Sequence, residues 1–246
     1  MSGFTGSEGS GTAMQESARP EAGNGGADWR QSKWLAAGEL VVVGLLFWAD
    51  FRHLIFFSKT PYLVLFGWIS LRVRKLRWRD VGMSWFRNWK ATLGWGIAAG
   101  LALEGFELFV SQPILVRLLR KQPDLEDFRP LARNLKVTLI FIALAWVLAA
   151  FGEEMVYRGY LMNRVADLFN RTRRAWILSL ILVHFGFALA HAYQGWTGII
   201  DEGLMGILLG VIYLRTGRNL AVPIVAHGIS DSIDMVLFFL GKYPGM

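Results

Sequence analysis

Three groups of ionisable residues in the second half of the chain fall inside apolar runs or at their edges. They are Glu153, Glu154 and Arg158; Phe187 with His191; and His227 with Asp231. A charged side chain near the centre of a bilayer costs about 3 kcal/mol on insertion scales. If these runs cross a membrane, each group therefore needs a structural or chemical reason to be there.

The spacing within each group suits one face of a helix. Glu154 and Arg158 stand at i and i+4, so the arginine can neutralise a buried carboxylate. Glu153 lies about 100° around the same helix and is free to face a neighbour. His227 and Asp231 repeat the spacing, and a carboxylate there can fix a histidine tautomer or join it in ligating a metal. Histidines with a carboxylate can bind zinc or orient a water molecule.

Composition indicates that these runs do cross a membrane. Of the 246 residues, 54% are apolar and 18% are charged, against about 45–50% and about 25% in soluble domains. No cysteine is present, which excludes disulfides, thiolate nucleophiles and iron–sulfur clusters. The net charge of +7 comes without a nucleic-acid recognition motif, so we expect anionic lipid rather than nucleic acid as the partner.

Seven apolar runs predict the fold. They cover residues 34–47, 62–71, 91–110, 137–152, 175–200, 203–214 and 219–240. Since a span takes about 20 helical residues, we expect an all-α, multi-pass bundle of about seven transmembrane helices, within a range of six to eight. The second run is the shortest and the weakest candidate. Residues 1–28 are predicted to be a disordered tail, and residues 29–246 a single membrane domain.

The distribution of Lys and Arg gives an orientation. With seven spans, about two thirds of the 26 basic residues fall on the side of the N-terminus, which predicts a cytosolic N-terminus. The tryptophans at positions 68, 78, 85, 89 and 95 fit an interfacial aromatic belt. The pairs Gly96/Gly100 and Gly206/Gly210 fit close helix contacts, although glycine is also common in membrane helices.

The depth of each ionisable group in the membrane, estimated from the helical rise, is not the same for all three groups. The helical rise places His227 about 13 Å beyond Arg218 but His191 about 25 Å beyond Arg174. His191 therefore lies nearer the far surface unless its helix tilts or begins outside the lipid. Glu39, Glu104 and Glu107 could line a cavity, but we expect interfacial or helix-contact roles for them. Asp201 and Glu202 stand where they can cap or enter the sixth span, and we expect no chemistry for them and a structural role for His184.

The three groups, in this order, resemble the signature of the CAAX-protease and bacteriocin-processing family (CPBP, or Abi). That signature reads Glu-Glu-x-x-x-Arg, then Phe-x-x-x-His, then His-x-x-x-Asn or Asp. The direct resemblance covers about residues 150–235. It implies an intramembrane endopeptidase acting on a peptide or protein, with a lipidated C-terminus if the chain is similar to the CAAX-processing branch. No His-Glu-x-x-His motif or Gly-x-Gly-Asp motif is present, which argues against other intramembrane protease designs.

The resemblance also implies roles for the residues. Glu153 becomes the base that activates water, while Glu154 and Arg158 form a supporting ion pair. His191 and His227 become either ligands of a divalent metal such as zinc or donors to the oxyanion. Asp231 replaces the asparagine of many members, and an ionised aspartate cannot donate to an oxyanion. This favours a bound cation, with Glu153 and Asp231 as further ligands, or a role for Asp231 in orienting His227.

A second class of function stays open at this point. The same carboxylates and histidines would suit a non-catalytic membrane factor, or a transporter coupled to ions or protons, because a fold can outlive an activity. Peptide hydrolysis distinguishes the two hypotheses, as does ion flux in proteoliposomes.

Overall fold

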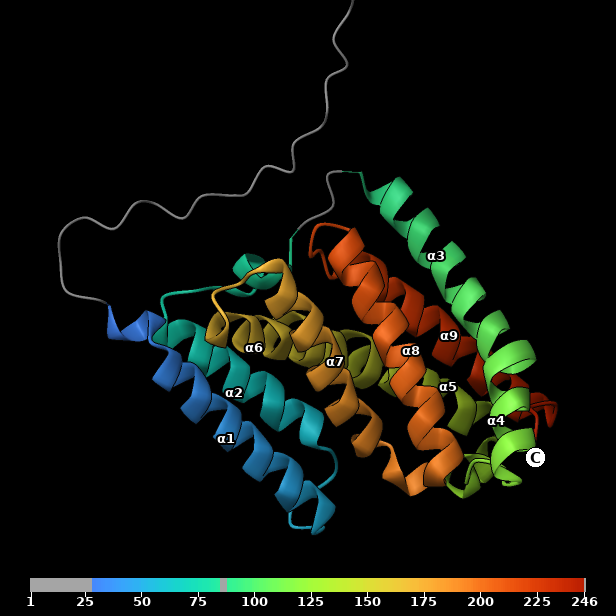
Figure 1. Cartoon of the computed structure of the whole chain (residues 1–246). Coiled ribbons are helices and arrows are strands. Elements are labelled where there is room, and N and C mark those ends of the chain that lie inside the picture. Colours follow the sequence, from blue (N-terminus) through green and yellow to red (C-terminus); the bar gives the residue numbers. More distant parts are fainter. Residues whose placement is uncertain (1–27, 85–87, 246) are drawn as a thin grey trace, which may run out of the picture.

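The computed structural model describes residues 28–84 and 88–245, and every regular element within these ranges is helical (Figure 1). The α-helices are α1 (Lys33–Phe51), α2 (Lys59–Val73), α3 (Trp89–Phe106), α4 (Gln112–Leu119), α5 (Leu135–Leu144), α6 (Met162–Leu168), α7 (Arg173–Ala190), α8 (Gly195–Arg215) and α9 (Ala221–Leu240). Short 3-10 turns are η1 (Trp29–Gln31), η2 (Trp78–Val81), η4 (Glu126–Leu131) and η6 (Ala192–Gln194). The predicted all-α fold is confirmed. The predicted tail and Trp85 lie outside the described residues, apart from Asp28.

Two π-helical segments join shorter helices into long rods. The segment η3 (Glu107–Ser111) connects α3 to α4, and η5 (Ala145–Leu161) connects α5 to α6. Six helical rods among the described residues are long and apolar enough to cross a membrane. At 15 residues, α2 falls short. The multi-pass architecture is confirmed, and the second run is the weakest, as its length predicts.

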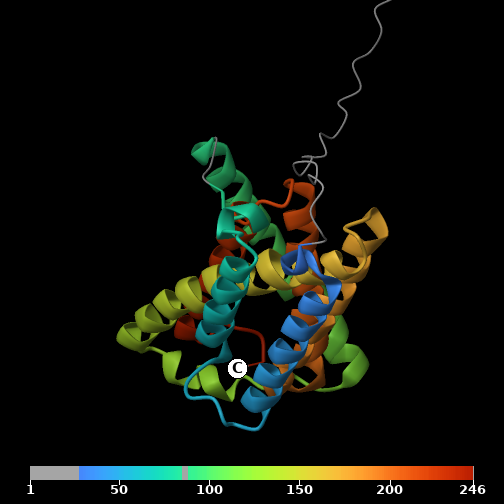
Figure 2. The ribbon, with the colours of Figure 1, turned by 90° about the vertical axis from the view of Figure 1, so that its left-hand side faces the viewer.

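The chain runs back and forth along the bundle (Figures 1 and 2). Helices α1, α3, α7 and α9 begin at one end, where α2, α6 and α8 finish. We call this the basic end, because the Arg-rich segments between α2 and α3 and between α6 and α7 lie there. The rod α5–η5–α6 crosses obliquely behind α7 and α8 in Figure 1, which carries residues 153–158 into the middle of the bundle.

Glycines allow the central helices to approach closely. A Cβ atom added at Gly100 of α3 would lie 2.6 Å from the carbonyl oxygen of Ala226 in α9, and one at Gly96 would lie 2.5 Å from Val225. A Cβ atom at Gly206 of α8 would lie 2.8 Å from the ring of Phe187 in α7. The predicted close contacts at both glycine pairs are therefore confirmed.

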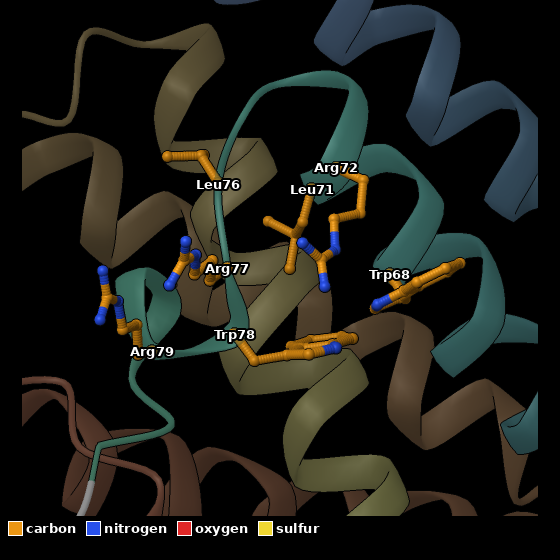
Figure 3. Close-up of a pocket in the computed structure, with 7 residues that line it drawn as sticks. All are labelled: Trp68, Leu71, Arg72, Leu76, Arg77, Trp78 and Arg79. Carbon is orange, nitrogen blue, oxygen red and sulfur yellow. The ribbon is translucent and has the colours of Figure 1, made fainter.

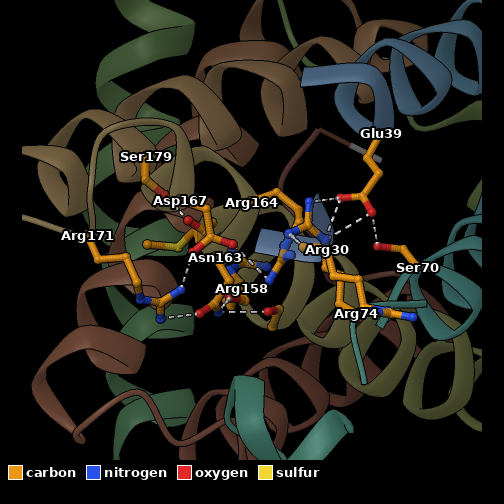
Figure 4. A network of polar contacts seen from close by, with 12 residues as sticks. Arg30, Glu39, Ser70, Arg74, Arg158, Asn163, Arg164, Asp167, Arg171 and Ser179 are labelled. Atoms are coloured by element: carbon orange, nitrogen blue, oxygen red, sulfur yellow. Dashed lines mark hydrogen bonds and ion pairs between the residues drawn. The ribbon is translucent and has the colours of Figure 1, made fainter. Parts of the chain in front are cut away.

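A buried polar network ties the helices together at the basic end (Figure 4). Glu39 of α1 accepts hydrogen bonds from Ser70 Oγ at 2.7 Å and from Arg74 Nη2 at 2.8 Å, so α1 and α2 are joined by a buried ion pair. Arg164 pairs with Asp167 at 3.0 Å, and Asp167 also pairs with Arg171 at 2.8 Å. Glu39 thus has the helix-contact role expected of it.

Candidate active site

The site is centred on a buried carboxylate, Glu154, which is supplied by η5. Its Oε1 atom accepts hydrogen bonds from Arg158 Nη1 at 2.8 Å and from His227 Nδ1 at 2.9 Å. The side chains of Glu154 and Arg158 are both 0% exposed. The i, i+4 pair predicted from the spacing is present, and α9 adds His227 to it. Because a buried carboxylate needs such partners, these three residues form one electrostatic unit.

Arg158 connects this unit to the neighbouring helices. Its Nη2 atom donates to the carbonyl oxygen of Gly206 in α8 at 2.9 Å. Its guanidinium lies 5.0 Å from the centre of the Phe187 ring in α7. Gly206 has no side chain, so its carbonyl and the Phe187 ring can both approach the arginine. One arginine therefore holds η5, α7 and α8 in register.

His227 lies between two carboxylates. Its Nδ1 atom faces Glu154, and its Nε2 atom lies 3.5 Å from Asp231 Oδ1, one helical turn further along α9. A carboxylate can only accept, so the Nδ1 atom carries a proton and donates it to Glu154. Asp231 is placed where it can orient the ring, one of the two roles that the sequence left open.

His191 lies at the end of α7 and reaches the unit through Phe187. Its ring is 4.6 Å from the Phe187 ring, centre to centre, and its Nδ1 atom is 2.9 Å from the Phe187 carbonyl oxygen. Since a carbonyl only accepts, the Nδ1 atom is the protonated one, and a neutral ring has its lone pair on Nε2. Within residues 28–84 and 88–245, no hydrogen bond or ring contact joins His191 to Glu153 or His227. Among the described residues, His191 is therefore linked to the Glu154–Arg158–His227 unit through the ring of Phe187.

Glu153 is half-buried and differs from Glu154 in having no fixed partner. In the part of the chain that the structure describes, its carboxylate makes no hydrogen bond or ion pair. It is near enough for its charge to act on His227 and Asp231, and also on Tyr193, which contacts His191. Its carboxylate oxygens are therefore available to a water molecule beside the buried unit.

A small cavity of about 50 Å³ opens beside His227 and Asp231, and neither Glu153 nor His191 is among the residues that line it. Phe187, His227 and Asp231 line it, together with four further polar residues: Glu107, Glu202, Ser230 and Asp234. Glu104 borders the group, because its Oε2 atom accepts a hydrogen bond from Ser230 at 2.8 Å. Glu202, to which the sequence assigns no chemistry, lines the cavity. The sequence contains a pattern that could have indicated these polar residues: the acidic pairs Glu104/Glu107 and Asp231/Asp234 are each three residues apart within an apolar run.

The residues do not assemble a metal-ligand set. Both nitrogens of His227 face carboxylates, and Glu154 Oε1 accepts two hydrogen bonds. Across the described ranges, no group of three or more His, Asp or Glu side chains is arranged to hold a metal ion. We therefore derive no step of the reaction through a metal.

Comparison with known proteins agrees with the motifs. Residues 135–233 match the family described as type II CAAX prenyl endopeptidase Rce1-like. "Uncharacterized protein YpbD" of Bacillus subtilis (strain 168) is 35% identical over 97 residues, which cover 39% of this chain and 42% of YpbD. The chain thus spans less than half the length of that curated relative. No solved structure matches. All three motifs lie inside the matched segment, so residues 135–233 are similar to the Rce1-like family.

Proposed function

We propose that the protein is an intramembrane endopeptidase that hydrolyses a peptide bond at the cavity beside His227. The observation that carries this proposal is the contact between Glu154 of η5 and His227 of α9, at 2.9 Å. It joins two of the three motifs, which are more than 70 residues apart in the sequence. His227 lines the cavity, and Glu153 precedes Glu154 in the chain. The family match supports hydrolysis over the transport alternative.

Glu153 is the general base in this proposal. Its carboxylate removes a proton from a water molecule, and the resulting hydroxide attacks the carbonyl carbon of the substrate. The same proton then passes to the amide nitrogen as the carbon–nitrogen bond breaks, which leaves a carboxylic acid and an amine. The lone pair on His191 Nε2 can accept a hydrogen bond, but no contact in the described ranges joins this residue to Glu153.

His227 stabilises the oxyanion in this proposal. The residue lines the cavity, and a proton on Nε2 of its imidazolium form can be donated to the developing negative charge. Glu154 and Arg158 are positioning residues: the carboxylate accepts from His227 Nδ1 and favours the imidazolium, in which Nε2 also carries a proton, and the arginine balances the charge of the carboxylate. The reaction described this way needs no metal ion.

The substrate proposed is a membrane-associated peptide or protein. The family description, type II CAAX prenyl endopeptidase, favours a C-terminal tail that carries a prenyl group. The apolar outer faces of the helices suit such a substrate, because a lipid chain can reach the bundle through the bilayer. We therefore expect a prenylated peptide to be cleaved in preference to the same peptide without the lipid.

The experiment compares the full-length protein with Glu153→Gln and His227→Ala in liposomes that contain a farnesylated CAAX peptide. We expect activity in the parent, a loss of at least about 100-fold in both variants, and unchanged activity in Glu126→Gln, a control whose carboxylate is exposed. Addition of a chelator should leave the parent rate unchanged. Activity in both variants near the parent level refutes the assignment, and chelator-sensitive activity refutes the metal-free scheme.

A further inference from the structure

A second hollow lies at the basic end, away from the residues of the candidate active site. It has a volume of about 250 Å³ and lies between the last turns of α2 and the η2 turn (Figure 3). Its polar and aromatic lining consists of three arginines and two tryptophans: Arg72, Arg77, Arg79, Trp68 and Trp78. We call it the arginine–tryptophan hollow. The proposed reaction uses none of these residues.

The positive charge in the hollow is not neutralised by the surrounding protein. Within the described ranges, no carboxylate lies within ion-pair distance of Arg72 or Arg77. Arg79 is 3.8 Å from Asp80, and both side chains are solvent-exposed, so this pair is weak. Arg72 and Arg77 therefore bring positive charge to the lining of the hollow without a counter-charge from the described chain.

The walls of the hollow are held in place by the fold. Gly67 of α2 leaves room for the indole of Trp78, because a Cβ atom there would lie 3.1 Å from Trp78 Cη2. The guanidinium of Arg72 lies 5.5 Å from the centre of the Trp68 ring, which favours a cation–π contact. Asp80 accepts a hydrogen bond from the backbone N–H of Arg77 at 2.7 Å and so fixes the start of η2. In Figure 3, Arg72 extends from α2 over Trp78, with Trp68 beside it.

We propose that the arginine–tryptophan hollow binds the phosphate of an anionic membrane lipid. Planar guanidinium groups pair with phosphate oxygens through two parallel hydrogen bonds. Tryptophan prefers the depth of the lipid headgroups, and Trp68 is 45% exposed at the end of an apolar helix. Basic pockets at the ends of transmembrane helices suit anionic headgroups. Free phosphate has the same chemistry, but the tryptophans and the interfacial position favour the lipid.

The test measures lipid binding to the purified full-length protein in a neutral detergent by native mass spectrometry. Phosphatidylglycerol is titrated against the parent and the double variant Arg72→Gln/Arg77→Gln, with phosphatidylcholine as the neutral comparison. We expect the double variant to bind phosphatidylglycerol at least about ten-fold more weakly, with phosphatidylcholine binding unchanged. The variant Arg72→Lys/Arg77→Lys, which keeps the charge but not the planar fork, should also bind more weakly than the parent.

The matched control is Arg173→Gln/Arg174→Gln. It removes the same charge from exposed residues at the start of α7, at the same end of the bundle but outside the hollow. We expect it to change phosphatidylglycerol affinity by less than about two-fold. An equal loss in both double variants would mean a general surface-charge effect and overturns the proposal. Glycerol phosphate binding as tightly as phosphatidylglycerol would overturn the lipid assignment.

Discussion

At the scale of single residues, the buried ion pair of Glu154 and Arg158 controls the site. Glu154 keeps its charge inside the bundle because Arg158 and His227 both donate to it. A polar group that loses its buried partner costs far more than one that loses an exposed partner. The consequences of substitution at these positions therefore depend on burial rather than on the number of contacts.

Replacing Arg158 should destabilise the protein strongly. Arg158→Met leaves a carboxylate at 0% exposure without its cation, and we expect a loss of about 3–5 kcal/mol in the free energy of unfolding. Arg129→Met is the control: its pair with Glu126, at 3.2 Å, has both side chains more than 70% exposed, so its loss should be below about 1 kcal/mol. Reversible unfolding in mixed micelles measures both. Similar losses would show that Arg158 has no special role.

Asp231 allows the hydrogen-bonding role of a residue to be separated from its charge. In the parent, His227 Nε2 lies 3.5 Å from Asp231 Oδ1. Asp231→Asn keeps a side-chain oxygen that can accept a hydrogen bond from this nitrogen, so the cleavage rate should stay within about ten-fold of the parent. Asp231→Leu removes the acceptor, and the rate should fall at least about 100-fold. Rates at saturating farnesylated peptide test this. If the asparagine variant is as slow as the leucine variant, the charge of Asp231 is what matters.

The sequence predicts contacts within one helix better than contacts between helices. The spacing of four residues is enough to predict the Glu154–Arg158 pair and the approach of Asp231 to His227. It does not say which neighbouring helix each face meets, so the bond between Glu154 and His227 needs the structure. The link between His191 and Arg158 also could not be predicted from spacing. It passes through the ring of Phe187, which contacts both side chains, and the Arg158 contact lies between two helices.

At the scale of helices, close packing decides where the site residues lie. Helix α9 carries His227 and Asp231, and it packs against α3 at Gly96 and Gly100. The glycine spacing predicts such contacts, but not that α9 is the partner of α3. The π-helical winding of η5 was also not predicted, since nothing in the composition of residues 145–161 distinguishes it from an ordinary helix.

Gly100→Ala should weaken the packing of α3 on α9. Its Cβ atom would lie 2.6 Å from the Ala226 carbonyl oxygen and 2.8 Å from Ile229 Cβ, which are parts of the structure that cannot easily move. We expect a loss of about 1–3 kcal/mol in stability, as for an overpacked core. The control is Gly94→Ala on the same helix, where nothing lies within 4 Å of the new atom. Thermal unfolding compares them, and equal midpoints would contradict the contact.

At the scale of the whole molecule, the number of crossings depends on α2. At about 1.5 Å per residue, its 15 residues span about 22 Å, less than the roughly 30 Å of the hydrocarbon core. The helix nevertheless runs between the two ends of the bundle and packs against α1 and η5 (Figures 1 and 2). We expect it to cross, with the bilayer thinned locally or with flanking residues supplying the missing length.

Single cysteines can test the number of crossings and the orientation together, because the chain has no cysteine of its own. The four variants are Leu54→Cys, Ser84→Cys, Arg174→Cys and Lys242→Cys, and all four positions are exposed. Residue 54 lies between α1 and α2, residue 84 follows η2, residue 174 lies at the start of α7, and residue 242 follows α9. Because the excess of Lys and Arg predicts a cytosolic basic end, a membrane-impermeant maleimide should label residues 54 and 242 in intact cells. It should label residues 84 and 174 only after permeabilisation. Labelling of 54 and 84 from one side would show that α2 does not cross, and the reverse pattern at all four would invert the orientation.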